Sequence, residues 1–426
     1  MLKRTLIPLL LGSGLYAASV SQLLDGVRHH YQAQLDNYSI QEADKALEMV
    51  RSQFWPKIRI FGSATHYNAP TNLRPATPTE NAKLSPQAGG NGDYPFSTDI
   101  YRVGATLSMP IFVANLFTLA DQTEAMRHSA AAKKEVDLLK NEATVLGANA
   151  NLRYLEQMKA SLHSKAKTLR TTEAIVKAKV KAGRAPASAL YKVQDRLDSI
   201  RIALDNIEVQ KENIRTLIET LSGVTLSHSA PMRQKGNYRP GPIFALKPLQ
   251  AKRQADELAA KAEQEKLYPS LHLDANINRG YGDSYFSGHN IHRDYGGIGL
   301  TLSAPLLDMP QIRSMQKARI HAMKSATELA KTADELKTKA KAMRRQLGLL
   351  RHALSLHRHN ISNEKKLVEI ARRSYEDGRM TLEEYLRYID SLYDAKAELY
   401  KTRAAYWQTL AQLAFLYGNR FERIVR

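Results

Sequence analysis

The sequence predicts a mainly helical protein that carries four short β-strands and contains an internal duplication. Long proline-free stretches with apolar residues at heptad spacing predict the helices. Four segments in which apolar and polar residues alternate predict the strands. The duplication follows from landmark residues that recur at intervals of 73 and 40 residues: Pro110, Gly183 and Gly223, then Pro305, Gly378 and Gly418. A unit of about 200 residues is too long for a solenoid repeat, so one architecture is expected to occur twice.

The composition excludes several classes of functional site. The chain has 426 residues, a formal net charge of +20 and no cysteine. Without cysteine there can be no disulfide, thiolate metal site or cysteine nucleophile. Solvated helix faces are the simplest explanation of the positive charge, and a surface that attracts polyanions is the other. No nucleic-acid-binding motif accompanies the charge, so nucleic acid is not expected as a partner.

Residues 1–18 have the pattern of a secretory signal peptide. Basic residues precede a short apolar run over residues 6–11, and small residues follow up to Ala17 and Ala18, where cleavage is expected. The run is too short to span a bilayer. No later segment holds the roughly 20 apolar residues that a membrane helix needs. The mature protein is therefore expected to be exported without a helical membrane span.

A helix is expected near the start of the mature chain, and two pairs of strands are expected further along it. Residues 20–55 are predicted to form a helix that ends at Pro56. Each predicted strand has one apolar and one polar face, and the four segments are 58–65, 101–109, 271–278 and 297–304. Within each pair the strands are joined by segments rich in turn residues, 68–97 and 281–293. These segments are expected to be surface loops.

Most of the remaining chain is predicted to be helical. A helix over residues 112–181 would be on the order of 100 Å long, which is typical of a coiled coil. In the following segment apolar residues recur every seven positions: Val193, Ile200, Ile207, Ile214 and Leu221. Near the end of the chain, two adjacent heptad series start at Tyr385 and Leu386. Two adjacent stripes suit a helix between two partners in a wall of helices; a simple antiparallel hairpin with a broad core is the alternative.

No group of residues has the spacing of a catalytic or cofactor site. His352, His357 and His359 lack the i, i+4 spacing of helical metal ligands. The glycines of residues 296–299 lie in a strand pattern, not in the strand–turn–helix context of a phosphate loop. Acidic residues are dispersed among lysine and arginine at helical spacing, as on solvated faces. The chain is therefore not expected to be an enzyme or to hold a cofactor or metal ion.

Two glycine turns interrupt the long helical patterns at equivalent positions. Gly183 is followed by Pro186, so one helix can end at the glycine and the next can begin at the proline. Gly378 forms the equivalent turn of the second copy. Each turn is either a plain hairpin connection or part of a functional tip, and the spacing alone leaves both interpretations open.

Four one-sided strands cannot close a membrane barrel within one chain. An open sheet edge in lipid leaves backbone groups without hydrogen-bond partners, and small membrane barrels need at least about eight strands. If the strands span a membrane, several chains must therefore share one barrel. The same oligomer would place their helices side by side in a cylinder.

In combination, these features resemble the TolC-like outer-membrane efflux protein family over essentially the whole mature sequence. They are the duplication, the proline that ends each helix before a strand, the strand–loop–strand–proline pattern and the glycine turns. The resemblance implies a homotrimer whose twelve strands, four from each chain, form an outer-membrane β-barrel, continued in the periplasm by a long α-helical coiled-coil barrel. It divides the chain into five parts: a signal peptide (1–18), a first structural repeat (19–223), a linker or equatorial segment (224–245), a second structural repeat (246–418) and a C-terminal tail (419–426).

The resemblance also implies which residues form the periplasmic tip, where the tunnel is gated and meets a periplasmic adaptor protein. Gly183 and Gly378 would mark this tip, and Tyr375 looks like a tyrosine that helps to hold it closed. Family members often carry acidic residues after the second turn, and the matching positions here are Glu384 and Arg387. Arg387 departs from the acidic, cation-selective pattern. A ring of three arginines facing the lumen would favour anions, although Glu384 could offset it locally.

The function implied by the resemblance is that of an outer-membrane channel in a tripartite efflux or type I secretion system. The channel would conduct substrates passively from a periplasmic adaptor and an inner-membrane pump to the exterior, with outer-membrane lipid around its barrel. The chain has no nucleotide-binding motif that could supply energy. Whether the substrate is a drug, a metal ion or a polypeptide stays open. The alternative is an exported, non-conducting coiled-coil protein with a binding or structural role.

Overall fold

The computed structural model of the chain describes residues 18–83 and 93–426. The predicted signal peptide lies outside the described residues, except for Ala18. The chain divides into a sheet unit and a helical unit. The sheet unit contains Ile40–Ser129 and Leu249–Leu329, and the helical unit contains the residues up to Ser39, Ala130–Pro248 and Ala330–Arg426.

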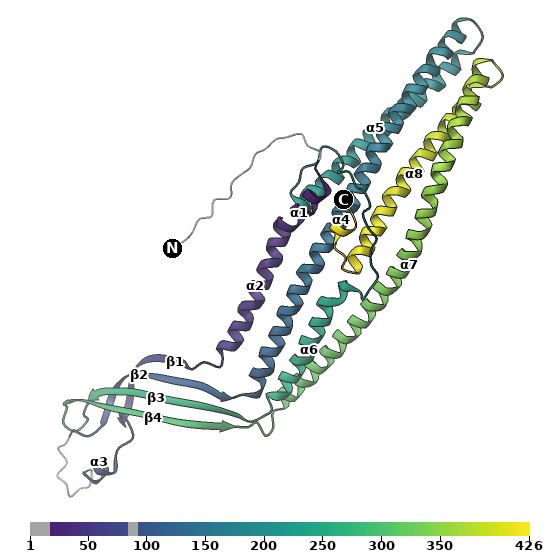
Figure 1. Ribbon diagram of the computed structural model, residues 1–426. Coiled ribbons are helices and arrows are strands. Elements are labelled where there is room, and N and C mark those ends of the chain that lie inside the picture. Colours follow the sequence, from purple (N-terminus) through teal and green to yellow (C-terminus); the bar gives the residue numbers. More distant parts are fainter. Residues whose placement is uncertain (1–17, 84–92) are drawn as a thin grey trace. The chain divides into compact units, whose positions relative to one another are not determined.

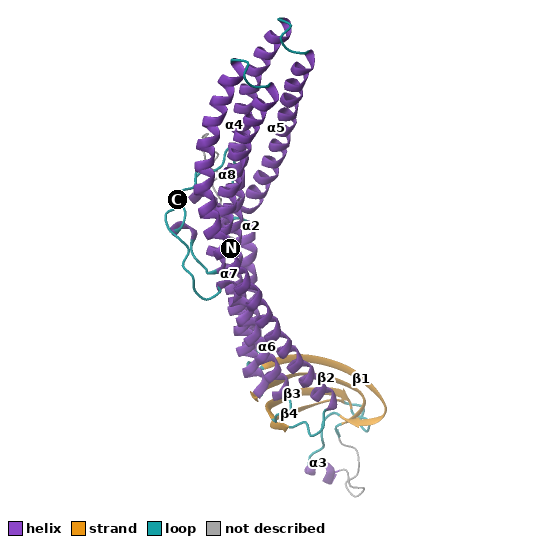
Figure 2. Ribbon diagram, turned by 90° about the vertical axis from the view of Figure 1, so that its right-hand side faces the viewer, coloured by secondary structure: helices purple, strands orange, loops and turns teal. Residues whose placement is uncertain are grey.

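The sheet unit is built around one four-stranded antiparallel sheet, whose curvature is visible in Figure 2. Its strands are adjacent in chain order: β1 (Lys57–Asn72), β2 (Phe96–Phe112), β3 (Ser270–Asp283) and β4 (Asn290–Ser303). The central pair, β2 and β3, joins the first structural repeat to the second (Figure 1). β1 and β4 are the edges, and neither has a second strand partner among the described residues. Each edge can therefore pair with a strand from outside the chain.

Apolar side chains from all four strands share one face of the sheet. Ile58 of β1 is opposite Leu107 of β2. Leu107 is also opposite Ala275 of β3, which in turn is opposite Ile298 of β4. Ile58 is 69% exposed and Ile298 is 77% exposed. The predicted alternation is confirmed, and the apolar face that it produces is uncovered in a single chain.

The strands extend further than the sequence patterns predict. β1 and β2 both continue into the predicted loop over residues 68–97, and another part of this loop forms α3 (Pro78–Lys83). The extension is fixed by a small buried cluster, which contains Leu73, Ile100 and Ile291. These residues are distant in sequence, so local patterns do not predict their contact. The many turn residues of this segment predict a loop instead.

Two helical hairpins make up most of the helical unit (Figure 1). α4 (Ala114–Lys181) pairs with α5 (Ala187–Ser222), and α7 (Met309–Glu376) pairs with α8 (Leu382–Leu416). α4 and α7 contain 68 residues each, as expected of a duplication. The shorter helices of the chain are α1 (Val20–His29), α2 (Tyr31–Ser52), α6 (Lys247–Glu265), η2 (Phe244–Leu246) and η3 (Phe421–Arg423).

No helix in residues 18–83 and 93–426 is both long enough and apolar enough to cross a membrane.

The prediction of one helix over residues 20–55 is wrong at His30, which separates α1 from α2. The backbone of His30 is extended, with φ −74° and ψ 169°. A close approach to the end of α5 accompanies this break, because a side chain at Gly223 would come within 2.8 Å of the His30 ring. The break lets α1 end and bury Leu23 and Leu24 in the main core. No periodicity in the sequence reports this long-range contact.

Two hydrophobic clusters stabilise the helical unit. The larger cluster joins both hairpins to α1 and to the end of the chain, and Leu413 and Phe421 are fully buried in it. The smaller cluster joins α4, α5, α7 and α8 near the hairpin turns. Burial of one large apolar side chain stabilises the fold by roughly 1.5–3 kcal/mol. The predicted heptad series account for much of this core: Val193, Ile200 and Ile207 on α5, and Tyr385, Leu392, Leu399, Tyr406 and Leu413 on α8.

The predicted linker, residues 224–245, has little regular structure but is firmly attached to the helices. The buried side chain of Asn149 on α4 donates to the Ala230 carbonyl at 2.9 Å and accepts from the Ala230 N–H at 2.8 Å. Gln234 pairs with Val425 near the end of the chain. These bonds hold the segment against the middle of the helical unit.

The landmark glycines have the same backbone geometry in both copies. The φ angles of Gly183 and Gly378 are 67° and 76°, and those of Gly223 and Gly418 are 67° and 68°. This left-handed conformation is easily adopted only by glycine and commonly ends helices. The recurrent spacing in the sequence therefore corresponds to four equivalent helix ends.

Candidate functional site

The turn between α4 and α5 is held by backbone hydrogen bonds. The Gly183 N–H donates to the Val180 carbonyl at 3.0 Å, and the Arg184 N–H donates to the Lys179 carbonyl at 2.8 Å. This pair of bonds is a Schellman motif. Pro186 precedes α5 and provides no side-chain cap. The first turn is thus an open hairpin end without a polar side-chain clasp.

The turn between α7 and α8 repeats the backbone motif and adds a side-chain clasp. Here the Gly378 N–H donates to the Tyr375 carbonyl at 3.1 Å. The Thr381 hydroxyl oxygen accepts from the Glu384 N–H at 3.2 Å, and the Glu384 carboxylate accepts from the Thr381 N–H at 2.9 Å. Both bonds of a capping box are therefore present. Hydrogen bonds from the Thr381 hydroxyl and N–H lower the pKa of Glu384.

Two tyrosines of the second hairpin are buried against the first. The rings of Tyr375 on α7 and Tyr385 on α8 stack with centroids 5.4 Å apart and an interplanar angle of 10°. The Lys179 ammonium of α4 lies 4.1 Å from the centroid of the Tyr375 ring and donates to the Tyr375 carbonyl at 3.2 Å. Burial raises the pKa of both phenols, so both stay neutral at physiological pH. This contact joins α4, α7 and α8.

A carboxylate on α8 bridges both helices of the first hairpin. Asp390 accepts from the Lys165 ammonium of α4 at 2.7 Å and also pairs with the Arg196 guanidinium of α5. The Lys165 side chain is 17% exposed, and the other two are 33% exposed, so water screens these pairs only in part. We call these contacts between the hairpins the hairpin latch, which consists of Lys165, Lys179, Arg196, Tyr375, Tyr385 and Asp390.

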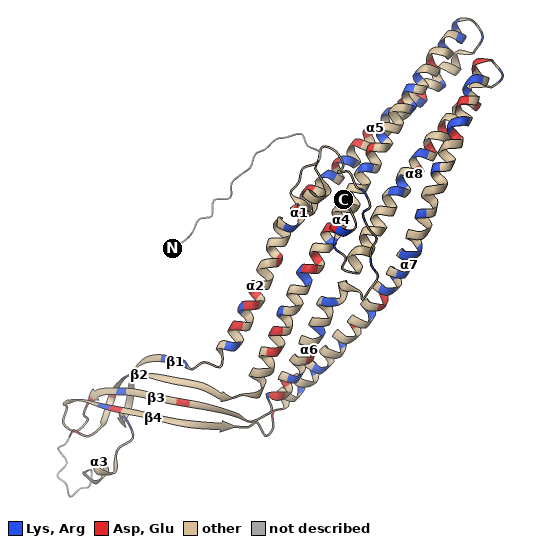
Figure 3. Cartoon of the chain, viewed as in Figure 1, with Lys and Arg blue, Asp and Glu red and all other residues tan. Residues whose placement is uncertain are grey.

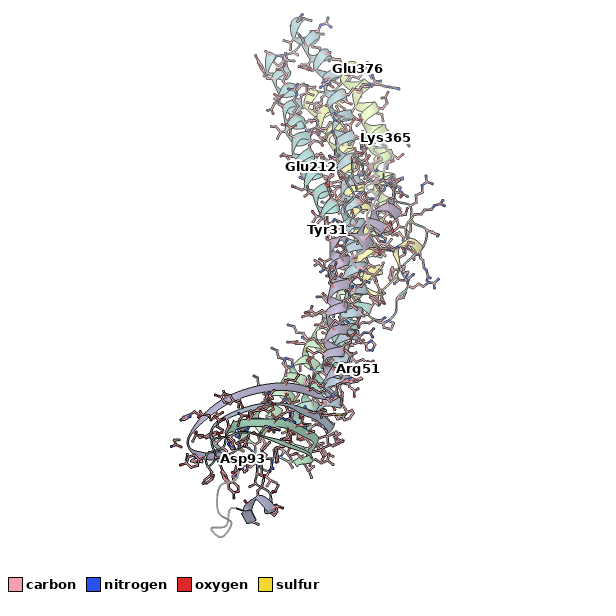
Figure 4. The ribbon with its side chains drawn as sticks, turned by 90° about the vertical axis from the view of Figure 1, so that its left-hand side faces the viewer. Tyr31, Arg51, Asp93, Glu212, Lys365 and Glu376 are labelled. Atoms are coloured by element: carbon pink, nitrogen blue, oxygen red, sulfur yellow. The ribbon has the colours of Figure 1, made fainter. Side chains whose placement is uncertain are left out.

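Glu384 and Arg387 lie on the exposed side of α8. They line one open groove together with Glu364 and Arg379. Glu376, at the end of α7, and Lys365, further from the turn, mark the adjoining helix in Figure 4. The Glu384 carboxylate is engaged in the capping box, whereas Arg387 has no ion pair within the described part of the chain. The groove therefore presents Arg387 as a solvated charge.

The structure separates the predicted tip residues into three groups. Gly183 and Gly378 form the turns, Tyr375 belongs to the hairpin latch, and Glu384 and Arg387 share the exposed groove. Sequence reasoning missed the charged members of the latch, because isolated charges at helical spacing resemble a solvated face (Figure 3). One signal was available for Asp390. It lies four residues after Leu386 and three before Tyr393, so it interrupts an apolar stripe.

Several solved structures with the same fold are outer-membrane proteins. The CmeC outer membrane channel of Campylobacter jejuni has a TM-score of 0.76 and 14% identity, covering 94% of this chain and 85% of CmeC. VceC of Vibrio cholerae has a TM-score of 0.76 and 14% identity, covering 94% of this chain and 96% of VceC. The open-state MtrE channel of Neisseria gonorrhoeae has a TM-score of 0.74 and 14% identity, covering 95% of this chain and 90% of MtrE. At such low identity these likenesses establish the fold. No curated protein matches the chain in sequence.

The second copy carries the decisive sequence match. Residues 244–419 match the profile of the family described as outer membrane efflux protein. The resemblance to TolC-like proteins is thereby confirmed, together with the mainly helical fold and its four strands per chain. Outer membrane efflux proteins are channels and not enzymes.

Proposed function

We propose that this protein is the outer-membrane channel of a tripartite efflux or type I secretion system. Three copies form a shared β-barrel in the outer membrane and a helical tunnel in the periplasm. Substrates cross this tunnel passively, supplied by an inner-membrane pump through a periplasmic adaptor. The observation that carries the proposal is a sheet with one exposed apolar face and two open edges.

The apolar face of the sheet suits contact with lipid. Ile58, Ile60, Leu300 and Leu302 are among its exposed side chains. A face of adjacent exposed apolar side chains is costly in water and is typical of a membrane or protein interface. The opposite face carries polar residues, including Thr106 and Asn276, which suit a water-filled lumen.

The open edges of the sheet require partner strands in lipid. Unpaired backbone groups cost several kcal/mol each in the hydrocarbon region, so a spanning sheet must close. Pairing β4 of one copy with β1 of the next satisfies both edges. Three copies give twelve strands, which is within the range of known outer-membrane barrels.

Exposed apolar residues on the helical unit suit the same neighbouring copy. Ile202 and Val209 on α5, and Leu349 and Leu356 on α7, are all more than half exposed, and each pair has heptad spacing. Val209 and Leu356 are each about 20 residues from their hairpin turn, so they lie at similar heights. The α5 stripe of one copy can therefore pack against the α7 stripe of the next, in a ring of head-to-tail contacts.

The hairpin latch is the element that would hold the periplasmic tip closed. It ties α7 and α8 to α4 and α5 through Asp390 and the Tyr375–Tyr385 stack. Opening separates these hairpins, which is a shift between two packings of one coiled coil. The adaptor binds at the exposed turns around Gly183 and Gly378 and biases this equilibrium. The protein itself needs no energy source.

Planar-bilayer recordings test this proposal. Wild type and Arg387→Asp would be compared, with Arg345→Asp as a control, because Arg345 is also exposed and has no ion pair in the described residues. Discrete single-channel conductance is expected. Selectivity should shift towards cations in Arg387→Asp and not in the control, because three positive charges at the tip become negative.

Two other outcomes are informative. Conductance without a selectivity shift would keep the channel but remove Arg387 from its constriction. Membrane-inserted trimers that never conduct, even when Tyr375 is replaced to loosen the tip, would favour an exported, non-conducting coiled-coil protein.

A further inference from the structure

Four arginines line one cavity in the middle of the helical unit. They come from three helices: Arg153 from α4, Arg351 and Arg358 from α7, and Arg403 from α8. The cavity has a volume of about 510 Å³, which is within the range of small-molecule sites in proteins. Arg153 and Arg403 are half-buried, whereas Arg351 and Arg358 are exposed. The arrangement places two guanidiniums in the wall and two towards solvent.

No carboxylate lines this cavity. Within residues 18–83 and 93–426, none of the four arginines forms an ion pair. The other half-buried arginines in the described part of the helical unit do have acidic partners. Arg28 pairs with Glu142, and Arg196 pairs with Asp390. The arginine cavity therefore differs from the surroundings of the other half-buried arginines in this unit.

A polar side-chain pair forms part of the cavity wall. The buried Tyr406 hydroxyl donates to the Gln234 amide oxygen at 2.9 Å. Arg351 in turn donates to the Tyr406 hydroxyl oxygen at 3.4 Å. Gln234 belongs to the linker segment, which Asn149 and Val425 hold in place. The wall of the cavity is thus fixed from both the helices and the linker.

The cavity is electrostatically unfavourable when it contains only water and screening ions. Burial lowers the pKa of Arg403, and the nearby positive charges of Arg358 and Arg153 lower it further. Like charges that share a partly buried site repel one another, and this repulsion opposes folding. A bound anion would remove the repulsion and gain charge-assisted hydrogen bonds from several guanidiniums.

We propose that this cavity is a binding site for a small multivalent oxyanion, of the phosphate or polycarboxylate class. The planar guanidinium fork matches the paired oxygens of such groups. Because four arginines converge from three helices, an anion with two or more charges can be bound from several sides. The site depends on the fold of the helical unit and not on conduction through the protein.

Calorimetric titration of the detergent-solubilised full chain with pyrophosphate tests the site. Saturable binding is expected, one pyrophosphate per chain, and Arg403→Gln should weaken it about tenfold, as expected for the loss of one charge-assisted hydrogen bond. Arg345→Gln is the matched control, because it removes an exposed arginine of α7 that is outside the cavity. Its affinity should equal that of wild type.

Thermal unfolding without pyrophosphate separates this proposal from the main competing one. If the cavity takes an anion, Arg403→Gln should unfold at the same temperature as wild type or higher, because one repelling charge is gone. If carboxylates of a neighbouring copy occupy the cavity, Arg403→Gln should instead destabilise the oligomer, and that result would overturn the proposal. Equal pyrophosphate binding by wild type and Arg403→Gln, or no binding by either, would overturn it as well.

Discussion

The two hairpin turns share a backbone but differ in their chemistry. Gly183 and Gly378 end α4 and α7 with the same pair of hydrogen bonds. The first turn continues through Pro186 without a side-chain cap, whereas the second continues through the Thr381–Glu384 capping box. The duplicated glycine preserves the direction of the chain, and the residues around it have diverged.

This divergence makes the two copies complementary. The first hairpin supplies the cations of the hairpin latch: Lys165, Lys179 and Arg196. The second supplies the aromatic rings and the carboxylate: Tyr375, Tyr385 and Asp390. A duplicated unit that kept identical side chains would bring like charges together. The difference between the copies is thus what allows one hairpin to hold the other.

The largest effect is expected where the second hairpin is buried against the first. Tyr385→Ala removes a buried ring that stacks on Tyr375, and large-to-small changes of this kind cost about 3 kcal/mol. This loss of stability should appear as faster amide hydrogen exchange in all four helices near the turns. Tyr191→Ala is the control, since the Tyr191 side chain is 69% exposed. Equal losses in both variants would mean that the tyrosine stack does not join the hairpins.

Replacement of the bridging carboxylate should have the next largest effect. Asp390→Asn leaves Lys165 and Arg196 half-buried without a counter-charge, and we expect a loss of about 2 kcal/mol after allowing for partial solvent screening. Urea unfolding of the tip, followed by hydrogen exchange, measures it. Asp394→Asn, one turn further along α8, should change stability by only a few tenths of a kcal/mol. A larger effect at Asp394 would place the bridge elsewhere.

The two glycine turns should lose similar stability on substitution, because both copies share the same backbone geometry at these positions. Gly183→Ala and Gly378→Ala each force a side chain into the left-handed conformation, at a cost of about 1 kcal/mol. Neither position has a heavy atom within 4 Å of the new Cβ, so steric overlap adds nothing. Local exchange rates at the two turns should rise by similar factors. A marked asymmetry would show that one turn is strained by its surroundings.

An effect of similar size should be specific to the second turn. Thr381→Ala removes the capping hydroxyl and should cost about 1 kcal/mol, whereas Ser188→Ala in the first turn should change little. The effect also depends on pH. The folded state lowers the pKa of Glu384 below its usual 4.5, so the capping interaction contributes fully above that value. This contribution is lost as the pH falls through the lowered folded-state pKa, and Thr381→Ala should flatten the dependence.

The sequence predicted the fold better than it predicted the site. Heptad spacing and alternation are local properties, so they identified the long helices and the four strands. Gly183 and Gly378 were recognisable because glycine turns recur at equal spacing. The break at His30 and the extension of β1 past residue 68 arise from contacts between distant segments. The bridge from Asp390 to Lys165 and Arg196 is of the same kind, since a charge does not reveal its partner across more than 190 residues.

Single-channel recordings of Asp390→Asn test the central claim most directly, namely that this protein is a channel held closed by contacts between unlike hairpins. A loss of about 2 kcal/mol across the latch should raise the ratio of open to closed states roughly 30-fold. Asp394→Asn should behave like wild type. Longer and more frequent openings are expected in Asp390→Asn alone. Identical open probabilities in wild type, Asp390→Asn and Asp394→Asn would contradict it.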